Sequence, residues 1–135
     1  GGKGKEIVPG KKPLSSMTPT IAFKDNEFFF TTGSPGGARI ITAVLQSILN
    51  MIDFNMDVAE ANNASRIHHQ WQPDRLEIEF GIDSDSSKWL TEAGYTIKII
   101  KPATNLQLIM KKNDTYSGYG DFRRPDSFAL GVTND

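Results

Sequence analysis

Residues 28–54, FFFTTGSPGGARIITAVLQSILNMIDF, are expected to form a strand, a glycine-rich turn and a helix in one continuous stretch. The run Phe28–Phe30 is unbroken rather than alternating, which is typical of a strand covered on both faces. From Gly37 to about Phe54 the apolar residues recur at steps of three and four, which predicts a helix with one broad buried stripe. The stripe comprises Ile40, Ile41, Val44, Leu45, Ile48, Leu49 and Ile52.

Before this stretch, Thr20–Lys24 is a second β-prone run. The short polar segment Asp25-Asn26-Glu27 separates it from Phe28–Thr32, so the two runs are expected to form a hairpin. Residues 1–12 contain four glycines, four lysines and a proline. This composition predicts an extended lead-in, with the folded domain in residues 13–135.

Two shorter elements are expected after the long helix. Asp57 is followed three residues later by Glu60, a capping-box pattern that predicts a short helix ending near Asn62-Asn63. The segment Leu76–Phe80 alternates between apolar and charged residues. Such alternation predicts a half-exposed strand.

The last third of the chain is expected to hold one helix and three strands. Asp83–Gly94 predicts a capped helix with Trp89 and Leu90 facing inward and Gly94 at its C-terminal stop. The strands are expected at residues 95–100, 106–111 and 115–119, the last two joined by Lys112-Asn113-Asp114. Strands, helices and strands in this order predict an α+β domain rather than regular βαβ units.

The composition excludes several classes of partner. The chain has 135 residues, with 15 basic and 16 acidic side chains and a formal charge of −1. It therefore lacks the basic character that binding to nucleic acid or an anionic membrane requires, and we expect neither partner. It has no cysteine, which excludes disulfides and thiolate chemistry. No apolar run approaches the roughly 20 residues that span a bilayer.

The turn Ser34-Pro35-Gly36-Gly37 could stabilise negative charge. Glycine lets the backbone approach a ligand closely, and the start of a helix presents unpaired N–H groups at the positive end of its dipole. Two such amides can form an oxyanion hole. An alternative remains open, in which Ser34 caps the helix, Pro35 is its first residue and the glycines only ease the turn.

The adjacent hydroxyls of Ser15 and Ser16 lie on a loop between Pro13 and Pro19. Together they could donate hydrogen bonds to a carboxylate, or they could simply be solvated loop residues. Neither serine has the surroundings of a hydrolase nucleophile, because the Gly-x-Ser-x-Gly motif is absent. The only histidines, His68 and His69, are adjacent in sequence without an obvious acid partner.

Metal binding is not expected at His68-His69-Gln70-Trp71. Adjacent side chains point in different directions, and the HExxH pattern and cysteine ligands are both missing. We expect no metal and no other cofactor. Arg123-Arg124-Pro125 near the C-terminus is interpreted as a surface or strand-end feature rather than an anion site.

Four separated motifs resemble those of the γ-glutamyltranspeptidases, in the same order. They are Lys12-Pro13-Leu14-Ser15-Ser16-Met17, Gly33-Ser34-Pro35-Gly36-Gly37, Val58-Ala59-Glu60-Ala61 and Arg66-Ile67-His68-His69-Gln70-Trp71. The resemblance extends from about Gly2 to Phe122, although the family often has an aromatic residue at the position of Ile67. Residues 120–124 depart modestly from its usual ending.

This family belongs to the N-terminal-nucleophile hydrolases, whose fold is a four-layer αββα sandwich. The resemblance implies that residues 13–135 are the C-terminal portion of the small-subunit domain, an incomplete part of that sandwich. It also implies that Ser15 and Ser16 bind the α-carboxylate of the γ-glutamyl group. The backbone amides of Gly36 and Gly37 would then form the oxyanion hole.

Family members cleave the γ-glutamyl amide of glutathione and related compounds. An N-terminal threonine attacks the carbonyl, with its own α-amino group as the base, and forms an acyl-enzyme. We expect that threonine upstream of Gly1, at the family's autoprocessing junction. We also expect a large subunit or upstream segment of the same precursor to cover Phe28–Phe30 and the stripe that begins at Ile40. These 135 residues alone are then expected to be inactive. Bacterial members are usually periplasmic or secreted.

Two other functions remain open. One is a related N-terminal-nucleophile acylase that acts on other amides, such as a β-lactam side chain or poly-γ-glutamate. The other is a non-catalytic anion-binding or assembly domain that has kept the fold. The residues around the nucleophile would separate the three hypotheses.

Overall fold

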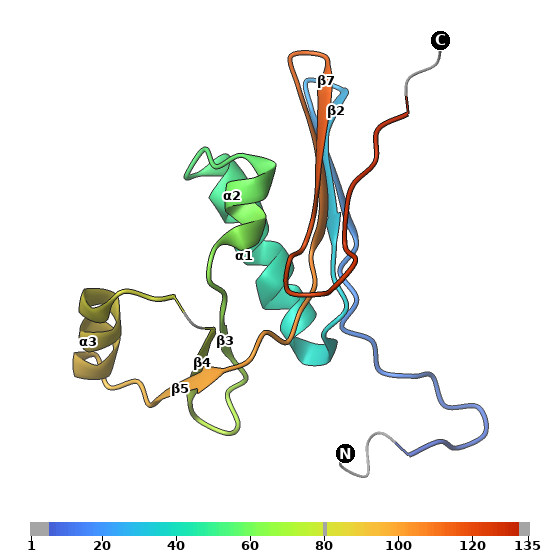
Figure 1. The fold of residues 1–135 in the computed structure, drawn as a ribbon. Helices are drawn as coiled ribbons and strands as arrows, with labels where there is room; N and C mark the ends of the chain where they lie inside the picture. The colour runs from blue at the N-terminus through green and yellow to red at the C-terminus, as the bar shows by residue number, and fades with distance from the viewer. Residues whose placement is uncertain (1–5, 80, 133–135) are drawn as a thin grey trace.

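The computed structural model describes residues 6–79 and 81–132 (Figure 1). Residues 6–19 contain no helix or strand. The elements that follow are β1 (Thr20–Lys24), β2 (Glu27–Gly33), a 3₁₀ turn (Gly37–Arg39), α1 (Ile40–Ile52), α2 (Val58–Asn63), β3 (Ile67–His69), β4 (Leu76–Glu79), α3 (Ser84–Glu92), β5 (Ile97–Ile100), β6 (Gln107–Lys112) and β7 (Thr115–Gly120). None of the helices in the described part of the chain is long and apolar enough to cross a membrane.

The larger sheet is antiparallel, with strand order β1-β2-β6-β7. It contains the predicted hairpin, whose turn is tighter than expected because only Asp25 and Asn26 have positive φ, 52° and 65°, and Glu27 already belongs to β2. Helices α1 and α2 cover one face of this sheet (Figure 1). The main core lies between them and is formed by Phe30, Met51, Val58, Ala61, Leu108 and Met110.

The C-terminal segment, residues 121–132, follows β7 and runs along the opposite face of the sheet (Figure 1). It lies directly against β7, because a Cβ atom added at Gly120 would be 2.5 Å from the Phe128 nitrogen. A Cβ atom at Gly118 would be 2.9 Å from that of Ala129. Glycine at both positions therefore permits the close approach of the two segments.

Helix α1 confirms the predicted periodicity, and the stripe is only partly buried within this chain. Ile40 and Val44 are buried. Four other residues of the stripe form an outer row that is 38–52% exposed: Ile41, Leu45, Leu49 and Ile52. Seven apolar positions cover more of the helix than one sheet face can contact, and burial of the outer row by another part of the precursor stays a prediction. We call these four residues the outer row of α1.

Strand β2 is likewise only partly covered within this chain. Phe30 is buried, whereas Phe28 and Phe29 are half-buried. Phe28 stacks on Tyr116 with ring centroids 5.9 Å apart, and Phe29 packs against the edge of the core. The strand is therefore only partly covered in this chain.

The smaller sheet has the order β3-β4-β5, antiparallel between β3 and β4 and parallel between β4 and β5. Strand β3 was not expected from the sequence. The half-exposed strand predicted at Leu76–Phe80 is instead buried at all four residues of β4. Glu77 and Glu79 tolerate this burial because arginines pair with both. Phe80 lies outside the described residues.

Both shorter helices are capped as predicted. The Asp57 carboxylate accepts hydrogen bonds from the Ala59 and Glu60 amides at 2.8 Å, while Glu60 Oε2 accepts one from the Asp57 amide at 2.9 Å. Asp83 caps α3 through Ser86 N, and Gly94 follows that helix with φ 93°. The inward orientation of Trp89 was wrong, because this side chain is 66% exposed. Leu90 is half-buried.

Candidate functional site

Four loop segments leave the larger sheet at the same end. The strand register pairs Thr20 with Thr32, Gly33 with Gln107, and Gln107 with Gly120. The segments before β1, after β2, before β6 and after β7 therefore converge there. The segment that holds the adjacent serines therefore enters the sheet at the same end at which the segment that holds the adjacent glycines leaves it.

The serine loop, residues 13–19, precedes β1. Ser15 is exposed, and its Oγ accepts a hydrogen bond from the Met17 amide at 3.2 Å. Ser16 is half-buried, and within the described chain its hydroxyl makes no hydrogen bond. The described residues also show no hydrogen bond between this loop and the glycine turn. Both hydroxyls therefore keep a proton to donate.

The glycine turn, Ser34-Pro35-Gly36-Gly37, has positive φ angles that favour glycine at its last two residues. Gly36 has φ 143° and Gly37 has φ 60°, values that side-chain-bearing residues rarely adopt. A 3₁₀ turn begins at Gly37 and continues into the 13 residues of α1. The first N–H groups of such a start have no partner within the helix. The amides that the sequence predicted as anion donors therefore lie at a helical N-terminus.

Ser34 does not cap this helix, so the alternative interpretation of Ser34 as the N-cap was wrong. Its hydroxyl donates to the Pro35 carbonyl at 2.6 Å and accepts a hydrogen bond from the Asn105 amide at 3.0 Å. The N-cap position of the 3₁₀ turn belongs to Gly36 and has no side-chain hydrogen bond. Ser34 instead ties the turn to the segment before β6.

That segment also packs against Gly36. A Cβ atom at Gly36 would lie 2.7 Å from Thr104 Cγ2 and 3.0 Å from the Ala103 carbonyl oxygen. Thr104 and Asn105 are each only 8% exposed. The glycine turn is thus supported from behind by a buried loop.

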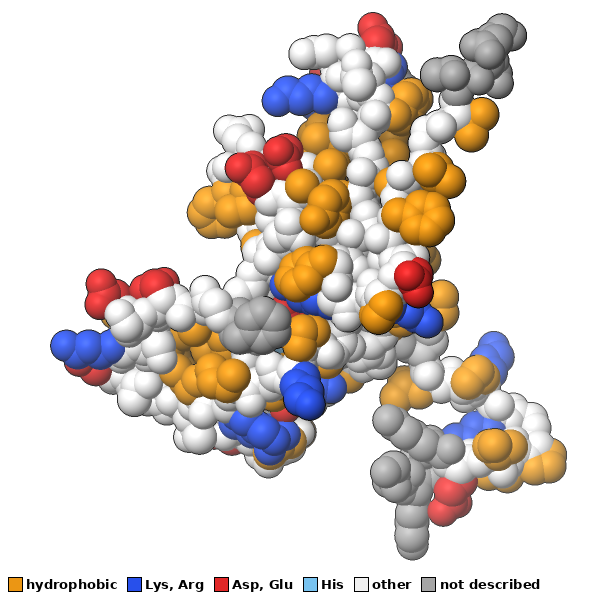
Figure 2. Space-filling view, viewed as in Figure 1, with side chains coloured by type: hydrophobic (Ala, Val, Ile, Leu, Met, Phe, Trp, Pro, Cys, Tyr) orange, Lys and Arg blue, Asp and Glu red, His pale blue; other side chains and the backbone are white. Residues whose placement is uncertain are grey.

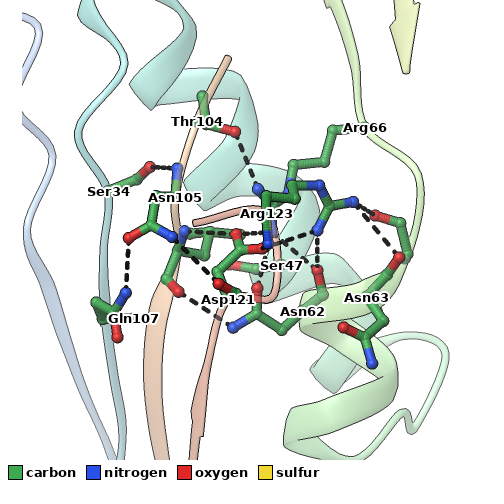
Figure 3. Close-up of polar contacts among 12 residues, drawn as sticks. Ser34, Ser47, Asn62, Asn63, Arg66, Thr104, Asn105, Gln107, Asp121 and Arg123 are labelled. Carbon is green, nitrogen blue, oxygen red and sulfur yellow. Dashed lines mark hydrogen bonds and ion pairs between the residues drawn. The ribbon is translucent and has the colours of Figure 1, made fainter. Parts of the chain in front are cut away.

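Behind this loop lies a buried cluster of two arginines and two carboxylates. Figure 3 shows three of its members, Arg66, Asp121 and Arg123. Asp121 Oδ2 is 2.8 Å from Arg66 Nη2, and its Oδ1 is 3.2 Å from Arg123 Nη1. Arg123 Nη2 is also 2.8 Å from Glu79 Oε2. All four side chains are at most 6% exposed. The opposite charges balance, which is the condition for burying charged groups.

Backbone and side-chain hydrogen bonds complete this cluster. Asp121 accepts from the Leu106 amide at 2.8 Å and from the Arg123 amide at 3.1 Å. Arg66 Nη2 donates to Asn62 Oδ1 at 2.7 Å. Arg66 Nη1 donates to Thr104 Oγ1 at 3.0 Å. The cluster therefore extends, through Thr104, to the back of the glycine turn.

The cluster sets the ionisation of its members. Burial acts to raise the pKa of Asp121, but the charge of Arg66 and the amides of Arg123 and Leu106 outweigh it. The pKa of Asp121 is therefore below its usual value, and the carboxylate is ionised at neutral pH. Burial and the neighbouring Arg123 lower the pKa of Arg66, and Asp121 opposes them.

A second ion-pair group links the start of α1 to β4. Glu77 accepts from Arg39 Nε at 2.9 Å and from Arg75 Nη2 at 2.8 Å. Burial acts to raise the pKa of Glu77, but hydrogen bonds from both arginines make the net shift downward. Arg39 follows the glycine turn directly, so Glu77 anchors that turn on its helical side.

His68 and His69 have separate neighbours. His68 Nδ1 is 2.8 Å from Thr42 Oγ1 and its Nε2 is 2.7 Å from Gln70 Oε1, while His69 Nε2 is 3.1 Å from Asp74 Oδ1. Among residues 6–79 and 81–132, no group of three or more His, Cys, Asp or Glu side chains could hold a metal ion. His68 thus connects β3 to α1.

The sequence interpretation missed the buried cluster. Arg123 was interpreted as a surface or strand-end feature. It does lie just after the end of β7, but its side chain is only 3% exposed, whereas its neighbour Arg124 is exposed. Arg66 appeared within a motif without a role. The available signal was the Asp121-x-Arg123 pair just after a strand, but its partners Arg66 and Glu79 are more than 40 residues away.

Comparison with known proteins gives consistent matches. The model of the family described as Gamma-glutamyltranspeptidase matches residues 3–131. The glutathione hydrolase proenzyme of Escherichia coli (strain K12) is 45% identical over 132 residues, which cover 97% of this chain and 23% of that protein. The chain thus spans about a quarter of the length of such curated relatives.

Solved structures show the same relationship. A mutant γ-glutamyltranspeptidase from Helicobacter pylori matches with a TM-score of 0.83 and 45% identity, covering 92% of this chain and 69% of that one. A cephalosporin acylase from Bacillus halodurans matches with a TM-score of 0.85 at 20% identity, covering 96% of this chain and 25% of that one, which shows a shared fold alone. These similarities and the mixed helices and sheets confirm the predicted fold class, α+β and part of the N-terminal-nucleophile hydrolase sandwich.

Proposed function

This chain belongs to the γ-glutamyltranspeptidase family, and from that premise we propose that it forms part of a γ-glutamyltransferase or glutathione hydrolase. The enzyme cleaves the γ-glutamyl amide of glutathione and related compounds through a γ-glutamyl-enzyme intermediate. The observation that carries the proposal is that the serine loop leads into, and the glycine turn leads out of, the same end of the larger sheet. In this proposal, hydroxyl donors for a carboxylate and amide donors for an oxyanion act together at that end.

Gly36 and Gly37 provide the oxyanion hole in this proposal. Their positive φ angles and their position at a helical N-terminus support it. A helix start carries about half a positive charge, which favours an anion there. The amides are fixed in the fold before the substrate binds, and removal of one such donor typically costs about 2.7–4 kcal/mol of transition-state stabilisation.

Ser15 and Ser16 bind the substrate's α-carboxylate in this proposal. The Ser15 hydroxyl accepts from Met17 N and keeps its own proton to donate, and Ser16 makes no hydrogen bond within the described residues. Two adjacent hydroxyl donors match the two oxygens of a carboxylate.

In this proposal the N-terminal threonine comes from an upstream segment of the same precursor, and that segment or a large subunit packs against this chain. The outer row of α1 supports a further layer of protein, because Ile41, Leu45, Leu49 and Ile52 are exposed along one side of the helix. On this proposal residues 1–135 alone do not turn over substrate. The family resemblance alone also suggests a periplasmic or secreted location.

The test is an assay of the complete processed enzyme with two anilides. γ-Glutamyl-p-nitroanilide carries the α-carboxylate and α-amino group, whereas butyryl-p-nitroanilide keeps the rest of the acyl chain without them. Preference for the γ-glutamyl compound would support the proposal. Preference for the butyryl compound would favour an acylase of other amides, and hydrolysis of neither would favour a non-catalytic domain.

A further inference from the structure

We propose that Thr104 is a positioning residue for the Gly36-Gly37 turn, and this inference rests on the proposed function of that turn. Its methyl group holds Gly36 in place, and its hydroxyl group belongs to the buried ionic cluster. The two halves of one side chain therefore have separable effects, one on catalysis and one on stability.

The glycine turn needs external support. Glycine has no side chain to restrict its backbone, so two consecutive glycines populate many conformations when nothing packs against them. The φ angles observed here, 143° and 60°, represent one conformation among these. An oxyanion hole works only when its donors are already in place, and a displacement of about 1 Å can cost about 100-fold in rate.

Thr104 supplies the nearest side-chain contact at Gly36. Its Cγ2 would be 2.7 Å from a Cβ atom placed on Gly36, so the methyl group occupies the space where any side chain would project. Thr104 is 8% exposed, which leaves it little room to withdraw. The methyl group therefore limits the movement of Gly36 toward the loop.

The direction of that methyl group is fixed by the hydroxyl group. Thr104 Oγ1 accepts a hydrogen bond from Arg66 Nη1 at 3.0 Å (Figure 3). Arg66 is itself held by Asp121 at 2.8 Å. Because both groups branch from the same Cβ atom, the hydrogen bond selects the χ1 rotamer and thus points Cγ2 at Gly36. The neighbouring contact from Asn105 N to Ser34 Oγ, 3.0 Å, holds the other end of the turn.

Two substitutions separate these roles in the complete processed enzyme. Thr104→Ser keeps the hydroxyl acceptor for Arg66 and removes the methyl group. Thr104→Val keeps a methyl group of the same shape and removes the acceptor. We expect Thr104→Ser to lower kcat for γ-glutamyl-p-nitroanilide at least tenfold, with nearly unchanged KM and thermal midpoint. We expect Thr104→Val to retain more of kcat and to unfold at a lower temperature, because Arg66 loses a buried partner.

The outcomes separate this inference from the proposed function. An active wild-type enzyme with unchanged kcat in Thr104→Ser would overturn the inference alone. Equal losses of kcat and thermal midpoint in both variants, or a Thr104→Ser protein that does not fold, would show a purely structural role and also overturn it. Absence of γ-glutamyl turnover in the wild-type enzyme would overturn the proposed function and the inference together.

Discussion

Arg66 and Asp121 are 55 residues apart in sequence, yet their Nη2 and Oδ2 atoms lie 2.8 Å apart in the interior. This ion pair joins the segment before β3 to the segment after β7. Asp121 Oδ2 also accepts a hydrogen bond from the Leu106 amide, so the pair fixes the loop that supports the glycine turn. The buried ionic cluster is thus connected, through Thr104, to the candidate oxyanion hole.

Substitution Asp121→Asn is expected to destabilise the protein strongly. It removes one negative charge from a buried group and leaves Arg66 and Arg123 with an excess of positive charge. Removing one partner of a buried pair typically costs about 3–5 kcal/mol. Guanidinium unfolding of the two proteins measures this difference. The control Asp114→Asn breaks an exposed pair with Lys111 and is expected to leave the midpoint unchanged. Equal midpoints for Asp121→Asn and wild type would contradict the structural role.

The Asp121 pair also predicts how stability depends on pH. The folded pKa of Asp121 is lower than its unfolded value, so its contribution is fully present above the unfolded pKa of about 3.9. The contribution is lost as pH falls through the folded pKa. The difference in unfolding free energy between wild type and Asp121→Asn should therefore be constant near neutrality and shrink below about pH 4. A difference that grows toward acid pH would refute this assignment.

The C-terminal segment is expected to depend on Gly120. A methyl group there would lie 2.5 Å from the Phe128 nitrogen, so Gly120→Ala must push the segment away from β7. Hydrogen–deuterium exchange of residues 127–132 should become faster. Gly33→Ala is a matched control, because its Cβ atom would meet nothing within 4 Å. Unchanged exchange in Gly120→Ala would mean that the segment does not pack as described.

Local signals predicted most of the elements. The periodicity of α1, the Asp57–Glu60 capping box and the polar turn at Asp25-Asn26 each depend on residues close in sequence. Such signals do not say which side of a helix meets the rest of the protein. The outer row of α1 has the same spacing as the inner one, so the pattern alone did not show which of the two is covered within this chain.

Charged residues in the interior were the other source of error. Glu77 and Glu79 made β4 look half-exposed, whereas arginines from distant segments neutralise both. The pairs Arg39–Glu77 and Arg123–Glu79 span 38 and 44 residues. Sequence spacing carries no information on such pairing, so the burial of the Arg123 side chain was not predicted. The serine and glycine pairs were selected because each has a recognisable local motif, and their roles stay predictions.

The outer row of α1 is expected to contact another part of the enzyme. Leu45 and Leu49 are exposed at 52% and 38% and lie one turn apart. The double substitution Leu45→Gln and Leu49→Gln should weaken association of the processed subunits, which size-exclusion chromatography and sedimentation can measure. Ile7→Gln, at a fully exposed position outside the helix, is the control. Association equal to wild type would exclude this surface as the interface.

Removal of the two serine hydroxyls tests the proposed carboxylate site directly. If Ser15 and Ser16 bind the α-carboxylate, Ala at both positions removes two hydroxyl donors to a charged group. A hydrogen bond to a charged group contributes about 1.5–3 kcal/mol, so the KM for γ-glutamyl-p-nitroanilide should rise tenfold or more. The value of kcat should change less, because the oxyanion donors lie on a different loop.

The decisive measurement is therefore kcat/KM of the Ser15→Ala, Ser16→Ala double variant of the complete enzyme for two substrates. With γ-glutamyl-p-nitroanilide it should fall at least tenfold relative to wild type. With butyryl-p-nitroanilide, which lacks the α-carboxylate, it should stay at the wild-type value. An equal fall for both substrates, or no fall for either, would contradict the assignment of this sheet end as the γ-glutamyl carboxylate site.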